Sequence, residues 1–252
     1  RARNVNLRIE AVDAAQIDPP RFAADPAQLF RDIRFHGLVR AEALAYAAAT
    51  FDGVVSQFGF EYADEQPAVA EVVRVLAPRG RLRLVMHARD GAVSSDIGQR
   101  LDRLRSVLSE RGPVTLVRTL VRALESGDMA TVARESAHLA AAAELARKLA
   151  ERPPRDDAAL FYASEVLLSW RRRDRYRVSD LRRSVEDGWA HADGVATRQD
   201  QMLRVARSPE DVRALTGKFV AAGLNVNPSQ KIHDERRGVQ IAWLIRADKP
   251  AA

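Results

Sequence analysis

A strand–helix–strand pattern in residues 51–86 limits the possible folds more than any other feature of the chain. Residues 51–56 form a short apolar run with β-branched side chains, and residues 65–76 carry apolar side chains at helical spacing. Helix-breaking residues follow at 78–80, and residues 82–86 are again typical of a strand. Two strands joined by a helix over about 35 residues form a βαβ unit. The sequence therefore predicts a parallel sheet with a right-handed crossover.

The residues before this unit predict one more strand and a long connection. Residues 6–12 alternate apolar and polar side chains, and Asp13 follows the C-terminal end of this strand. Residues 18–50 begin with two prolines and then place apolar side chains, among them Leu29, Ile33 and Leu44, at helix-like spacing. We therefore expect an insertion with helical character between the strand at 6–12 and the strand at 51–56.

Helical spacing dominates the chain from residue 95 to about residue 222. Three amphipathic stretches lie at 114–124, 132–149 (closed by residues 152–154, Arg-Pro-Pro) and 160–170. Ser208 as N-cap, Pro209 at the first helical position and Asp211 three residues after the cap predict the start of a last helix.

Two strand-like segments, 224–232 and 239–245, end the chain and are joined by a polar turn at 233–238. A connection this short makes the two strands antiparallel. The sequence therefore predicts a β-hairpin after the last helix.

Composition excludes several classes of protein. The 252 residues contain 46% hydrophobic side chains, enough for a core, but no apolar run of about 18 residues that could span a membrane. The absence of cysteine excludes disulfides and thiolate metal sites, and it is compatible with the cytoplasm, the compartment that we expect. The five histidines are scattered, so we predict no metal site. The net charge of +6 suits an anionic partner, but arginine in a solvated surface explains it, so nucleic-acid binding is not favoured.

Three stretches together resemble the second half of the class I S-adenosylmethionine-dependent methyltransferases. They are RARNVNLRIEAVDA at the start, FDGVVSQFGFEY with EVVRVLAPRGRLRLVMH in the βαβ unit, and AAGLNVNPSQKIHDERRGVQIAWLIRADKP at the end. The first resembles the end of a helix and the third strand of that family. The second resembles its fourth strand, the following helix and its fifth strand, and the third resembles its terminal hairpin.

The resemblance implies a cofactor site for S-adenosylmethionine at the ends of these strands. Asp13 would accept a hydrogen bond from the adenine amino group, and the N–H of Ala14 would reach adenine N1. Ser56, Gln57 and Phe58 would line the methionine part of the cofactor. This agrees with the rule that open α/β sheets bind ligands beyond the carboxyl ends of their strands.

The same resemblance places Glu61, Tyr62 and His87 toward the methyl acceptor. His87 follows the predicted fifth strand, where a general-base role is conceivable. Methyl transfer from a sulfonium needs mainly alignment of the nucleophile, so the sequence identifies no catalytic residue.

The chain departs from the family in one respect. No two of its glycines are separated by a single residue, and the first is Gly37, so the glycine-rich loop that follows the family's first strand is absent. The family's second strand ends in an acid that holds the ribose hydroxyls, and we expect the chain to begin after that strand. We expect an N-terminally truncated Rossmann-like α/β sheet that is incomplete as an enzyme. The expected parts are a partial core (1–94), a helical insertion or cap (95–207), and the last core helix with the hairpin (208–252).

Four functions are compatible with these patterns. The leading one is methyl transfer from S-adenosylmethionine to a small molecule, and the alternative is a non-catalytic methyltransferase-like module that binds a partner. A nicotinamide oxidoreductase is disfavoured because Tyr46 and Tyr162 both lack a lysine four residues later. A nucleic-acid-modifying enzyme is favoured by charge alone. The acceptor and the oligomeric state are not specified by the sequence.

Overall fold

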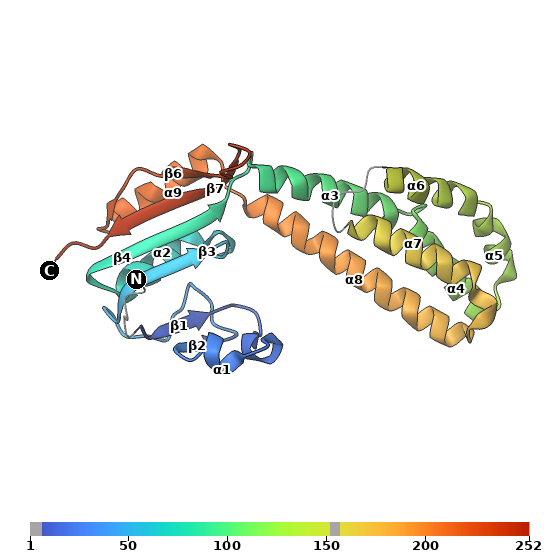
Figure 1. Ribbon diagram of the computed structural model, residues 1–252, viewed down its shortest axis with the longest axis horizontal. Coiled ribbons are helices and arrows are strands. Elements are labelled where there is room, and N and C mark those ends of the chain that lie inside the picture. The colour runs from blue at the N-terminus through green and yellow to red at the C-terminus, as the bar shows by residue number, and fades with distance from the viewer. Residues whose placement is uncertain (1–6, 152–156, 252) are drawn as a thin grey trace. The chain divides into compact units, whose positions relative to one another are not determined.

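The computed structural model describes residues 7–151 and 157–251, so residues 152–154, predicted to close a helix, and residue 6 lie outside the described part. The chain divides into two compact units: Arg1–Gly91 with Val205–Ala252, and Ala92–Arg204. The first unit combines strands with helices and the second is helical (Figure 1). This mixed architecture is consistent with a Rossmann-like methyltransferase fold, as the sequence predicted.

The βαβ unit is confirmed. Strand β3 (Phe51–Gln57) pairs in parallel with β4 (Leu76–His87), and helix α2 (Glu65–Val75) connects them. The helix ends at Val75, before Pro78, and β4 starts at once. A residue that precedes proline is driven to extended backbone, so Ala77 already belongs to the strand.

The terminal strands complete this sheet and confirm an antiparallel hairpin, although residues 224–232, predicted as one strand, form two short ones. Strand β7 (Gln240–Asp248) pairs antiparallel with β4, with β5 (Asn225–Val226) and with β6 (Gln230–His233). The strand order is β3-β4-β7-β5, with β6 also on β7.

The insertion predicted for residues 18–50 contains a strand, and this corrects two expectations. After the short helices η1 (Pro19–Phe22) and α1 (Pro26–Leu29), β2 (Ile33–His36) pairs in parallel with β1 (Ile9–Val12). The helical interpretation of this segment was wrong because IRFH alternates apolar and polar side chains, and β1 supplies the hydrogen bonds that four isolated residues lack.

The presence of β2 also changes how the strands compare with the family. Counted back from β3 as the fourth strand, β2 takes the third place and β1 takes the second. The assignment of residues 6–12 to the third strand was therefore wrong. Asp13 ends the second strand of the series instead.

The core of the first unit lies between one face of the larger sheet and two helices. Helices α2 and α9 (Pro209–Ala221) contact each other, and Leu82, Leu84 and Met86 of β4 are buried among their apolar side chains. Because side chains alternate along a strand, Arg83, Val85 and His87 point to the opposite face. His87 is the last residue of β4, and its ring stacks on that of Phe58, which directly follows β3.

The predicted start of α9 is confirmed. The Ser208 side chain accepts a hydrogen bond from the Asp211 N–H, and the Asp211 carboxylate accepts one from the Ser208 N–H. This hydrogen bond from the Ser208 N–H lowers the pKa of Asp211.

Replacing Ser208 with alanine is expected to lower the free energy of unfolding by about 1 kcal/mol, because the N-terminal N–H groups of α9 lose their acceptor. Thr216→Ala, at a half-buried position of the same helix away from the cap, is the control, and it should change stability by less than about 0.5 kcal/mol. Urea denaturation of both variants checks this. Equal losses in the two would show that the capping box contributes nothing.

The second unit is built from helices that bury one apolar cluster. Residues 132–149, predicted as one helix, form two, because the helical hydrogen bonds are interrupted at 137–138. Among the described residues, no helix is both long and apolar enough for a membrane span. The helices of this unit are α3 (Ala92–Leu108), α4 (Pro113–Ser126), α5 (Met129–Ser136), α6 (Leu139–Glu151), α7 (Ala158–Arg171), η3 (Arg173–Arg175) and α8 (Val178–Val205).

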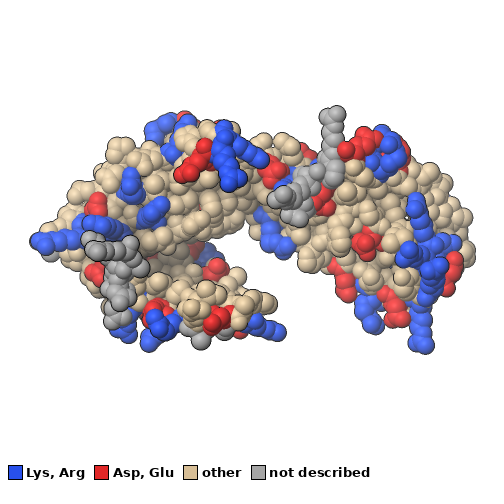
Figure 2. All heavy atoms as spheres, viewed as in Figure 1, with Lys and Arg blue, Asp and Glu red and all other residues tan. Residues whose placement is uncertain are grey.

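Arginine side chains of the second unit are engaged by carboxylates. Arg118 and Arg122 both bind Glu186, and the Arg118 guanidinium also lies 3.8 Å from the centre of the Trp189 ring. Basic and acidic side chains are interspersed over the face shown in Figure 2. These arginines therefore form ion pairs within the unit, in addition to contributing to the positive net charge.

Candidate functional site

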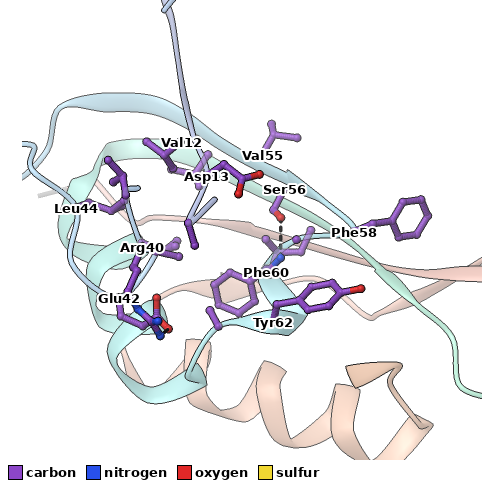
Figure 3. A pocket seen from close by; sticks show the side chains of 18 residues that line it. Val12, Asp13, Arg40, Glu42, Leu44, Val55, Ser56, Phe58, Phe60 and Tyr62 are labelled. Atoms are coloured by element: carbon purple, nitrogen blue, oxygen red, sulfur yellow. Dashed lines mark hydrogen bonds and ion pairs between the residues drawn. The ribbon is translucent and has the colours of Figure 1, made fainter. Parts of the chain in front are cut away.

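A cavity of about 490 Å³ opens at the carboxyl ends of β1 and β3 (Figure 3). Its volume falls within the range of roughly 300–1,000 Å³ that is typical of small-molecule sites. All of its lining belongs to the first unit. The lining residues are Val12, Asp13, Ala14, Val39, Arg40, Ala41, Glu42, Leu44, Val54, Val55, Ser56, Phe58, Gly59, Phe60, Tyr62, Ala63, Val72 and Leu84.

Two of the predicted cofactor residues, Asp13 and Ala14, enter the cavity from the end of β1. One carboxylate oxygen of Asp13, Oδ1, accepts a hydrogen bond from the Ala15 N–H at 2.8 Å. The backbone oxygen of Asp13 accepts one from the Val39 N–H at 2.9 Å. The second carboxylate oxygen, Oδ2, has acceptor capacity for a ligand.

The end of β2 packs tightly on the loop that follows β1, and Gly37 makes this possible. A Cβ on Gly37 would lie 2.9 Å from the Ile17 nitrogen and 3.0 Å from the Ala15 oxygen. A side chain there would push the loop away and displace Asp13.

Helix α2 holds the loop that follows β2. Glu71 accepts a hydrogen bond from the Leu44 N–H at 2.7 Å, and Arg74 donates to the Leu44 and Tyr46 backbone oxygens at 2.9 and 2.6 Å. One wall of the cavity is therefore fixed by charged side chains of α2. The hydrogen bond from Arg74 also lowers the pKa of Glu71.

Glu42 ties the same loop to the start of α2. Its Oε1 accepts hydrogen bonds from the Asp64 N–H at 3.0 Å and from Arg40 Nη2 at 2.7 Å. The hydrogen bond from the Asp64 N–H is the main cause that lowers the pKa of Glu42 below its ordinary value. The carboxylate is therefore the form that joins the loop to the helix.

The link through Glu42 is expected to break only in acid. Because its pKa is lowered in the folded chain, its stabilising effect is complete above the ordinary carboxyl pKa of about 4.3 and is lost as the pH falls through the lowered pKa. The Asp64 amide resonance, followed by NMR from pH 7 to pH 2, should shift with a midpoint below that ordinary value. Glu42→Gln should remove this shift, and a midpoint at or above the ordinary value would contradict the prediction.

The end of β3 brings Ser56 and Phe58 to the cavity, whereas Gln57 does not line it. Ser56 Oγ accepts a hydrogen bond from the Phe60 N–H at 2.9 Å, which closes the turn after the strand (Figure 3). Phe58 has a φ of 57°, a left-handed backbone that is unusual for a bulky residue. Such strain costs on the order of 1–3 kcal/mol and tends to occur at functional sites.

Of the predicted acceptor-side residues, Tyr62 lines the cavity, and Glu61 and His87 lie next to it. Glu61 and Tyr62 belong to η2 (Phe60–Tyr62). Burial, and then the charge of Glu61, raises the pKa of Tyr62. Glu61 is only 2% exposed, and its Oε1 is 2.8 Å from His87 Nδ1.

The stretch 39–44, five of whose residues line the cavity, was not predicted from the sequence. It is the loop that follows β2, and because β2 was not predicted, this loop was not recognised as part of a site. The alternation in IRFH was the signal that could have shown it. Among the described residues, no group of three or more potential ligands could hold a metal ion.

Comparison with protein families matches residues 13–84 to a family described as a methyltransferase domain. This stretch runs from Asp13 through β2, β3 and α2 into β4, and it includes most of the cavity lining. This part of the chain therefore resembles a methyltransferase domain. The resemblance seen in the sequence is thus confirmed, and S-adenosylmethionine is the cofactor that the family implies.

Solved structures similar to this chain include two S-adenosylmethionine-dependent methyltransferases. One, from Thermotoga maritima, is described as a possible histamine N-methyltransferase; it is 12% identical, with 96% of this chain and 82% of that one covered, at a TM-score of 0.39. The other, from Methanosarcina mazei, has the same identity and coverage at a TM-score of 0.40. These scores are below 0.5, so the family match alone carries the assignment. No curated protein matches the chain.

The residues of the methyltransferase cavity fit the adenosyl part of S-adenosylmethionine. The Asp13 carboxylate only accepts hydrogen bonds when ionised, and the ribose and adenine of the cofactor offer O–H and N–H donors. Val12, Val39 and Leu44 provide apolar walls for a planar ring. The site therefore combines the Asp13 carboxylate with a mostly apolar lining.

Proposed function

We propose that this methyltransferase domain binds S-adenosylmethionine in the cavity and transfers its methyl group to a small-molecule acceptor. One observation carries the proposal: the cavity lies at the carboxyl ends of parallel strands, within the stretch that matches the methyltransferase family. Ligands of open α/β sheets bind at this edge. Four of the five predicted cofactor residues, Asp13, Ala14, Ser56 and Phe58, line the cavity.

The strand order supports a particular arrangement of the cofactor in the cavity. Because β1 takes the place of the second strand, we propose that Asp13 holds the ribose hydroxyls, and not the adenine amino group. The adenine ring would then lie toward 39–41, which follow β2 and line the same cavity. Ser56 and Phe58, at the end of β3, remain the proposed contacts of the methionine part.

The main contribution of the protein to methyl transfer is to align the acceptor with the methyl group of the cofactor. The bound cofactor supplies an electrophilic methyl group on a sulfonium, and the acceptor must approach it in line. The buried turn after β3, closed by the Ser56–Phe60 hydrogen bond, gives the reaction a rigid wall. Tyr62 stands on the next turn, where it would contact the acceptor.

Calorimetry with S-adenosylhomocysteine and with NAD tests the proposal. We expect S-adenosylhomocysteine to bind to this chain, and NAD not to bind. Binding of NAD alone would favour an oxidoreductase. Binding of neither ligand would leave the non-catalytic module as the better explanation of the fold.

A further inference from the structure

Glu61 and His87 form a buried pair that cofactor binding does not explain. Glu61 Oε1 accepts hydrogen bonds from the His87 backbone N–H at 3.0 Å and from His87 Nδ1 at 2.8 Å. The Glu61 side chain is 0% exposed and that of His87 is 12% exposed. Burying a carboxylate is costly unless it has a compensating partner, so His87 is the group that makes this position tenable for Glu61.

Neighbouring groups hold both members of the pair in place. The Phe58 ring stacks on the His87 ring with their centroids 4.2 Å apart. The Arg207 backbone N–H donates to the His87 backbone oxygen at 2.8 Å, and its Nη2 donates to the Glu61 backbone oxygen at 3.1 Å. The imidazole is therefore restrained along its face, at Nδ1 and at its backbone.

The geometry determines which nitrogen of His87 carries the proton. A carboxylate can only accept, so Nδ1 carries the hydrogen that lies between it and Glu61 Oε1. In the neutral ring Nε2 is then the unprotonated nitrogen, with a lone pair able to take a proton. Glu61 Oε2 is buried and, among the described residues, has no hydrogen-bond partner.

We propose that His87 is the general base of the methyl transfer and that Glu61 is its positioning residue. This inference rests on the proposed function. As the acceptor's lone pair forms the new bond to the methyl carbon, the carbon–sulfur bond breaks with its electron pair passing to sulfur. The acceptor's proton moves to His87 Nε2. The resulting imidazolium is stabilised by the Glu61 carboxylate, the role that an acid plays beside a catalytic histidine.

A base is needed only for acceptors that lose a proton, so the pair also defines the substrate class. The acceptor is a small molecule with a hydroxyl or a neutral N–H amine as the reacting group. Phe58 belongs to both sites: it lines the cavity and stacks on His87. The strained backbone of Phe58 thus connects the cofactor wall with the base.

Nitrogen-15 NMR of histidine-labelled protein tests the pair without any substrate. We expect His87 in the tautomer protonated at Nδ1, and Glu61→Leu, which removes the acceptor, to populate the form protonated at Nε2. His36 provides an internal contrast, because its Nε2 lies 2.6 Å from Glu10 and it should show the opposite tautomer. His87 protonated at Nε2 in the unchanged chain, or a tautomer insensitive to Glu61→Leu, would overturn the proposal. The first of these readouts needs no variant to fold.

Kinetics separate the failure of this proposal from the failure of the proposed function. With S-adenosylmethionine and a panel of amines and phenols, His87→Asn and Glu61→Gln should lower kcat on the order of 100-fold or more. KM for the cofactor and the Kd of S-adenosylhomocysteine should stay within about twofold, since neither residue lines the cavity. Glu61→Asp should recover part of the rate, and Glu10→Gln is the matched control.

Each outcome has a definite meaning. An undiminished rate of methyl transfer in His87→Asn would overturn the role of His87 as general base and leave the proposed function intact. If the unchanged protein does not bind S-adenosylhomocysteine, the proposed function fails, and the tautomer still decides whether the pair is built as described.

Discussion

Replacing Phe219 with alanine is expected to lower the free energy of unfolding of the α/β unit by about 3–5 kcal/mol. Phe219 is completely buried in the cluster between α2, α9 and the sheet, and its ring lies 5.8 Å from that of Phe60. Its removal leaves a cavity that the rigid sheet cannot fill, and it withdraws support from the turn after β3. Loss of stability and loss of cofactor affinity should therefore appear together.

The effect of Phe219→Ala can be followed separately in each unit. Trp243 belongs to the same cluster, whereas Trp170 belongs to the cluster of the helical unit. With fluorinated tryptophan, the urea midpoint of the Trp243 signal should fall, and that of Trp170 should not. The neighbouring Val220→Ala, at a position 57% exposed, is the control and should cost less than about 0.5 kcal/mol. A Trp243 midpoint no lower than in the control would show that this cluster does not hold the unit together.

The second large effect is expected in cofactor binding by Asp13→Asn. The amide can still accept the hydrogen bond from the Ala15 N–H, so the loop should keep its shape while the charge is lost. A hydrogen bond to a charged group contributes about 1.5–3 kcal/mol. We therefore expect S-adenosylhomocysteine to bind about 10–100-fold more weakly.

Calorimetry checks the Asp13→Asn prediction, with Asp32→Asn as the matched control. Asp32 is an exposed aspartate at the opposite end of the same two-stranded sheet, next to the first residue of β2. An unchanged Kd in Asp13→Asn would show that the carboxylate does not contact the cofactor. Loss of binding in both variants would point to damage of the small sheet.

The variants also distinguish the two contacts that Asp13 could make with the cofactor, one with the ribose and one with the adenine amino group. If Asp13 holds the ribose, a 2′,3′-dideoxy analogue of S-adenosylhomocysteine should bind weakly to the unchanged protein and lose little more in Asp13→Asn. If Asp13 instead contacts the adenine amino group, the analogue should lose as much as the natural nucleoside does. The comparison therefore tests the strand order as well as the residue.

Several features could be predicted from the sequence because they depend on local order along the chain. The βαβ unit follows from the change of period between 51–56 and 65–76, and the start of α9 follows from Ser208, Pro209 and Asp211. The antiparallel hairpin follows from the shortness of its turn. In each case the interaction joins residues close in sequence, so the local sequence pattern is enough to predict the structure.

The strand β2 could not be predicted in the same way. Its four residues are too few to show a clear alternation of apolar and polar side chains. The apolar residues on either side of them recur at helix-like spacing. Pairing with β1, more than 20 positions earlier, determines its structure. The place of Asp13 in the strand order depends on that pairing. The resemblance of the sequence therefore implied a contact with adenine, whereas the fold supports the proposed contact with the ribose.

The sequence by itself determined the α/β class, the methyltransferase resemblance and the strand ends that carry Asp13, Ser56 and Phe58. Only the tertiary structure decided that 39–44 form a wall of the cavity, and that Glu61 meets His87 across 26 positions of chain. The physical reason is the range of the interactions. Periodicity and capping act within a turn or a strand, whereas a cavity wall and a buried hydrogen bond exist only after distant segments have packed.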